Sequence, residues 1–185
     1  SLDLQKNLRC LSIFPAPFDR PAAAAIWDLD EQTAQPFLDS LVNASLLDYD
    51  ETTGFRRHDL VRFFAATKLS PQESYTASLR HATHYLEVAR QADEIFLQGG
   101  DHTLAGLRLF DTHWPHIRLG QSWSAAQPAT DLEASRLCTT YPDSAVDCLN
   151  LRLHPEQWIA WLQSALAAAR RLGDKKYQGF HLGNL

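Results

Sequence analysis

A histidine and an aspartate, His58 and Asp59, stand side by side where a short predicted strand gives way to an apolar-periodic helix. An imidazole at such a junction can donate a hydrogen bond to a phosphate oxygen, and its charge responds to small changes in the local field. The helix N-terminus just beyond it offers free N–H groups and a dipole that favours anions. These two residues could therefore contact a nucleotide. The alternative is that Asp59 only caps the helix and His58 ends the strand, and the spacing alone favours this alternative.

Other residue types that could do chemistry form no complete motif. Two histidine pairs, His81/His84 and His113/His116, have the i, i+3 spacing that can put two metal ligands on one helical face. No HExxH motif and no acidic third ligand at a fixed spacing accompanies them, so we predict surface or interface histidines and no metal site. Neither a GxSxG nucleophile motif nor a GxxxxGK[ST] phosphate-binding loop is present. We therefore predict that this chain is not an enzyme and does not bind or hydrolyse nucleotide properly by itself.

Composition places the chain among ordinary globular proteins. Its 185 residues, 45% hydrophobic and 21% charged, suffice for one large domain or two small ones. No apolar run approaches the roughly 20 residues of a membrane helix, and the start does not resemble a signal peptide. Three cysteines without a CxxC motif fit a reducing compartment. These features predict a cytoplasmic protein without a membrane partner.

The first 70 residues show the order of elements expected of a winged-helix domain. Helical periodicity ends before Pro15 and Pro17, and a Gly-containing loop at 50–54 separates two short strand-like runs. A further apolar-periodic segment follows this hairpin. The predicted helices span 2–14, 22–27, 30–43 and 59–69, and the predicted strands span 46–49 and 55–57.

Beyond Ser70 every periodic segment is helical. A long helix is predicted to end at Gly99 and Gly100, and the next is predicted to kink or break at Pro115. After a loop at 127–131 we predict two short helices divided at Pro142. The last clear helix runs from His154 to Gly173, another starts near Lys176, and Trp158 and Trp161 are predicted to be core residues. Paired helices with alanine at contact positions are typical of helical repeats.

Several of these stretches resemble a known arrangement. Residues 11–15, 38–46 and 57–62 resemble the winged-helix region that follows the NB-ARC nucleotide-binding module in STAND-class signal-transduction NTPases. Residues 161–174 and 181–185 resemble the tetratricopeptide (TPR) repeats that often follow it. The fold expected is mainly α: a winged-helix domain with a small β-hairpin at 1–70, a helical connector at 71–150, and the start of a TPR-like array at 151–185.

The resemblance also implies site residues and partners. In the family, a Met-His-Asp motif on the winged helix contacts bound ADP and holds the module shut. By resemblance His58 is the nucleotide sensor and Asp59 its orienting partner, while Arg57 stands where the family often has Met. With the resemblance included, nucleotide contact is favoured over a purely structural strand-end role for His58. ADP or ATP would bind only together with an upstream NB-ARC module, and the family usually assembles into homo-oligomers.

The chain starts at Ser1 without Met and stops within a helical pattern, so we expect it to be a piece of a longer protein. The resemblance implies that this longer protein is a signalling NTPase and that the chain is its regulatory piece. It would couple ADP/ATP state to downstream TPR repeats that bind an unknown protein or small-molecule ligand. The alternative is a helical-repeat scaffold without nucleotide sensing. A third possibility is a DNA-binding winged helix. The helix that would enter the groove, 30–43, has three acidic residues and no basic one, which argues against DNA binding.

Overall fold

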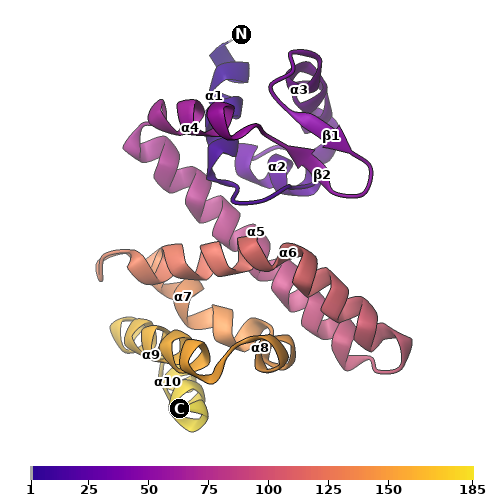
Figure 1. Ribbon diagram of the computed structural model, residues 1–185. Helices are drawn as coiled ribbons and strands as arrows, with labels where there is room; N and C mark the ends of the chain where they lie inside the picture. The colour runs from indigo at the N-terminus through magenta and orange to yellow at the C-terminus, as the bar shows by residue number, and fades with distance from the viewer. Residues whose placement is uncertain (1) are drawn as a thin grey trace. The chain divides into compact units, whose positions relative to one another are not determined.

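The computed structural model describes residues 2–185, which are mainly α-helical (Figure 1). These residues form ten α-helices and a two-stranded antiparallel hairpin, and they are 78% helical, which confirms the mainly α fold expected from the sequence. Two compact units divide at His81 and Ala82, and each is described separately. The division falls inside a helix, whereas the sequence suggested a boundary near residue 70. Among residues 2–185 no helix combines the length and apolar character that crossing a membrane requires.

The first unit begins with two short helical segments, α1 (Leu2–Cys10) and the 3-10 helix η1 (Leu11–Ile13). The single helix predicted for 2–14 is therefore wrong at its end. Phe14 is extended, with ψ 126°, as expected for a residue that precedes a proline, and the chain tightens into a 3-10 turn before it.

Two capped helices and a hairpin follow (Figure 1). Asp side chains close both helices at their N-termini: Asp19 accepts from the Ala22 N–H and Asp30 from the Thr33 N–H, each at 2.9 Å. The hairpin pairs Asp48 with Arg56, which puts residues near the start of one strand beside the end of the other. The elements are α2 (Arg20–Trp27), α3 (Glu31–Asn43), β1 (Asp48–Asp50), β2 (Gly54–Arg56) and α4 (Asp59–Thr67).

Aromatic residues form the centre of the first unit. Phe14 and Phe18 stack with ring centroids 4.1 Å apart, and Phe18 exchanges two backbone hydrogen bonds with Phe55 of β2. Gly54, at φ 83°, lies so close to the Phe18 carbonyl that a Cβ would collide with it. The hairpin is therefore fixed to the segment between η1 and α2.

Two of the remaining helices continue through prolines at which the sequence predicted a kink, a break or a boundary. The helix through Pro115 is continuous, so Pro115 does not divide it into two helices. Pro142 also lies inside a helix, and the chain changes direction at Ala145 (φ −150°, ψ 50°), so the division predicted at Pro142 is wrong by three residues. The elements are α5 (Pro71–Leu97), α6 (Asp101–Ala126), α7 (Leu132–Ser144), α8 (Val146–Arg152), α9 (Pro155–Leu172) and α10 (Lys175–Asn184).

Buried polar contacts tie the second unit together. The Tyr141 hydroxyl donates to the Ala82 carbonyl at 2.7 Å, and Asp93 accepts from the Cys148 N–H in the first turn of α8 at 2.8 Å. Trp161 is buried as predicted, with its ring centroid 5.9 Å from that of Trp114. Trp158 is only half-buried, which corrects the core prediction, because it lies in the first turn of α9.

Candidate functional site

His58 stands at the N-cap position of α4, two residues after β2 ends. Its backbone is extended (φ −66°, ψ 142°), and its side chain makes no capping hydrogen bond to the helix. The side chain is 61% exposed, and its Nε2 lies 3.5 Å from an Asp48 carboxylate oxygen. The imidazole is therefore accessible, and it forms an ion pair with Asp48 when it is protonated.

Asp59 does not occupy the capping position that the simpler interpretation assigned to it. It is the first residue of α4, is exposed, and lies in the first helical turn, where a negative charge complements the helix dipole. Among the described residues, Asp48 is the acid beside His58. Asp48 was not predicted from the sequence as a site residue. The hairpin register pairs Asp48 with Arg56, which brings Asp48 near His58.

Arg57 is a buried arginine, although the resemblance assigned it the least chemical role of the three motif positions. Its side chain is 8% exposed, its Nη2 donates to the Phe14 carbonyl at 2.8 Å, and its Cζ lies 5.7 Å from the Phe18 ring centroid. Its Nε and Nη1 make no hydrogen bond within the described residues. Burial, with a smaller contribution from Arg62, lowers the pKa of Arg57 to about 9. Arg57 thus anchors the turn that presents His58.

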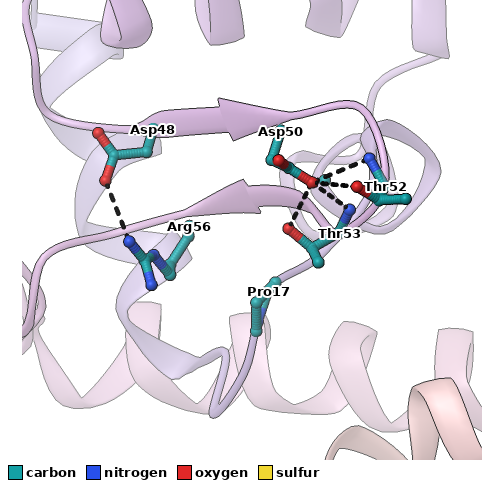
Figure 2. A pocket seen from close by; sticks show the side chains of 7 residues that line it. Pro17, Asp48, Asp50, Thr52, Thr53 and Arg56 are labelled. Atoms are coloured by element: carbon teal, nitrogen blue, oxygen red, sulfur yellow. Dashed lines mark hydrogen bonds and ion pairs between the residues drawn. The ribbon is translucent and has the colours of Figure 1, made fainter.

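An open pocket of about 390 Å³ lies beside the hairpin (Figure 2). Figure 2 shows that its polar side chains already interact: Asp48 with Arg56, and Asp50 with Thr52 and Thr53. One Asp50 oxygen accepts four hydrogen bonds from these threonines, which lower the pKa of Asp50 to about 2. Neither His58 nor Asp59 lines the pocket. The pocket borders the candidate site at Asp48, which lines the pocket and also lies 3.5 Å from His58.

One histidine of each pair is buried, which departs from the surface or interface positions predicted, whereas His84 and His113 are half-buried. His81 and His116 are buried, and His116 stacks on Tyr85 with ring centroids 4.3 Å apart. The aromatic packing of these imidazoles accounts for their burial. Within residues 2–185 no group of three or more His, Cys, Asp or Glu side chains is arranged to hold a metal ion.

The α4 N-terminus is the feature that could receive an anion. Four other helices, α2, α3, α7 and α10, have an Asp side chain bonded to an N–H of the first turn, whereas α4, like α6 and α8, has no side-chain bond from its N-cap residue. Free N–H groups, the helix dipole and an exposed imidazole together can bind one phosphate-sized anion.

Comparison of the chain with protein-family models, with curated proteins and with solved structures returns no significant match.

Proposed function

We propose that this chain is a regulatory fragment of a STAND-class, NB-ARC-containing signalling NTPase of the cytoplasm. Its first unit is a winged-helix domain in which His58 contacts ADP held by an upstream NB-ARC module. Its last helices open a TPR-like array that binds a protein or small-molecule ligand. ADP favours a closed state, and exchange for ATP frees the winged helix to move as a body and expose surfaces for homo-oligomeric assembly.

The exposed His58 at the uncapped N-terminus of α4 is the observation that carries this proposal. Its imidazole is accessible, and the N-cap side chain makes no hydrogen bond to the N–H groups of the first turn. A phosphate bound there would accept hydrogen bonds from both sources. Arg57 supports the role indirectly, because its bond to the Phe14 carbonyl holds the turn before α4.

The order of elements supports the winged-helix assignment. Three helices precede a short antiparallel hairpin, and a fourth helix begins three residues after it. The end of the chain supports the repeat assignment in the same way. The pair α9 and α10 is joined by a turn in which Gly173 adopts φ 69° and Asp174 caps α10 through the Tyr177 N–H. Gln178 reaches back to the Ala169 carbonyl, so the two helices pack directly.

One observation favours the alternative of a helical interaction scaffold without nucleotide sensing. The charged neighbour of His58 is the Asp48 carboxylate, and a second negative group beside a phosphate raises the free energy of binding. Under this alternative, His58 and Asp48 form a surface ion pair that stabilises the hairpin by less than about 1 kcal/mol.

The two functions are separated by the retention of ADP in the full-length protein. In the sensor function, His58→Ala speeds ADP release and raises basal signalling, and Asp48→Asn slows release because it removes the competing charge. In the scaffold function, both variants release ADP at the wild-type rate. His154→Ala is the matched control, since His154 is also an exposed N-cap histidine, at the start of α9. Release measured with fluorescent ADP distinguishes these outcomes.

A further inference from the structure

Helix α4 exposes a continuous apolar face. Leu60, Phe63 and Phe64 are 84%, 73% and 62% exposed. With Thr67 they occupy positions i, i+3, i+4 and i+7, which form one side of a helix. We call these four residues the α4 face. The opposite side of the same helix contributes the buried Ala65 to the first unit, so the helix is amphipathic with its larger apolar side turned outward.

The α4 face is comparable in size to the largest exposed apolar patch of a typical monomer, and such patches are often functional. At roughly 200 Å² for each of its three large side chains, their exposed fractions leave roughly 400 Å² of apolar surface in contact with water. A contiguous patch of this size on one nine-residue helix marks an interaction site more often than a free surface.

The charges at the two ends of the face indicate the kind of partner. Asp59 lies in the first turn of α4, and Lys68 is the C-cap residue, with its Nζ 5.4 Å from the Phe64 ring centroid. Arg62 is turned away, since its Nε donates to the Ser12 carbonyl at 3.4 Å. A cationic rim would suit an acidic peptide or an anionic membrane. The α4 face instead has an acid at one end and a base at the other. It therefore suits a partner surface that places a base opposite Asp59 and an acid opposite Lys68.

We propose that the α4 face is the docking site for a second copy of this chain, with the two α4 helices antiparallel. This arrangement brings the Asp59 end of each helix to the Lys68 end of the other and opposes the two helix dipoles. The two-fold axis passes between Phe63 and Phe64, so that Leu60 of one copy faces Thr67 of the other. The proposal does not depend on the nucleotide-sensing role of His58.

The exposed area sets the expected strength. Two faces bury roughly 800 Å² from their large side chains, which is less than the roughly 1,200 Å² of stable specific complexes. The dimer is therefore weak and reversible, with dissociation expected in the range of tens to hundreds of micromolar, on the order of −5 to −7 kcal/mol.

Sedimentation of the 185-residue chain tests the proposal. From about 5 µM to about 1 mM, the average mass should rise towards twice the monomer mass of 20.9 kDa. Phe63→Ser with Phe64→Ser should remain monomeric, and circular dichroism verifies that it is folded. Leu104→Ser, at a residue of similar exposure on α6, should associate like wild type. A wild-type chain that stays monomeric overturns the proposal, and so does a double serine variant that still dimerises. Monomers that sediment with phosphatidylserine vesicles would assign the face to lipid and also overturn it.

Cysteine cross-linking tests the antiparallel orientation. When Leu60→Cys and Thr67→Cys chains are mixed and oxidised, the mixed disulfide should exceed either homodimer at least several-fold. The three native cysteines are buried and give a low background in the parent chain. A parallel pair, in which each position meets its own copy, would give mainly homodimeric disulfides and contradict the geometry.

Discussion

Replacing the buried Arg57 by Met should stabilise the first unit. The folded state keeps the guanidinium out of water, and among the described residues no carboxylate pairs with it. Burial lowers the pKa of Arg57 to about 9, and at about 1.36 kcal/mol per pKa unit the folded protein bears a cost of about 5 kcal/mol for this charge. Met fills a similar volume without a charge.

Two favourable contacts offset most of that cost. The hydrogen bond to the Phe14 carbonyl contributes about 1.5–3 kcal/mol because its donor is charged, and the contact with the Phe18 ring adds about 0.5–2 kcal/mol. The net gain expected for Arg57→Met is therefore about 1 kcal/mol. Urea denaturation followed by circular dichroism at pH 7 measures it. Arg56→Met, at an exposed neighbour with only a 3.8 Å ion pair to Asp48, should change stability by less than about 0.5 kcal/mol.

The pH dependence gives a second check on Arg57. A lowered pKa means that the unfolded chain binds the proton more tightly, so wild-type stability should increase as pH rises above about 9. The advantage of Arg57→Met should shrink over the same range. If Arg57→Met is destabilised by more than about 1 kcal/mol at pH 7, the Phe14 contact outweighs the desolvation of the guanidinium, contrary to this prediction.

Two further predictions concern the second unit. Gly120→Ala should destabilise it by about 1–3 kcal/mol, because the added Cβ would overlap the Tyr141 hydroxyl, whereas Gly179→Ala, with open space around it, should be neutral or slightly stabilising in thermal unfolding. His181 is buried with its Nε2 2.9 Å from the Thr139 hydroxyl, and burial lowers its pKa. Its contribution to stability is complete above pH 6.5 and is lost as pH falls further, so wild type should lose stability between pH 7 and pH 5 more steeply than His181→Gln in urea titrations; equal slopes would contradict this.

Local sequence signals predicted most elements of the fold. Prolines, glycines and Asp caps marked the starts of α2, α3, α5, α9 and α10 within a residue or two. The errors arose where tertiary packing outweighs a local signal. Pro115 and Pro142 lie inside helices that their neighbours hold together, and Trp158 has the correct periodicity but lies in the terminal turn of α9.

The candidate site was only partly predictable. The position of His58 at the start of α4 follows from the strand-to-helix junction, and the structure agrees on this point. The surroundings of Arg57 depend on Phe14 and Phe18, some forty residues earlier in the chain, and no local pattern encodes such a contact. The position of Asp48 depends on the register of the hairpin, whose turn is held by hydrogen bonds from Thr52 and Thr53 to Asp50.

The central claim is that His58 contacts bound ADP. The most direct measurement is calorimetric ADP affinity of the nucleotide-stripped full-length protein, compared among wild type, His58→Ala and the N-cap control His154→Ala. We expect His58→Ala to lose ADP affinity tenfold or more, about 1.4 kcal/mol, and His154→Ala to lose none, with both variants folded. Equal affinity in all three proteins would contradict the sensor function and leave His58 as the partner of Asp48 in a surface ion pair.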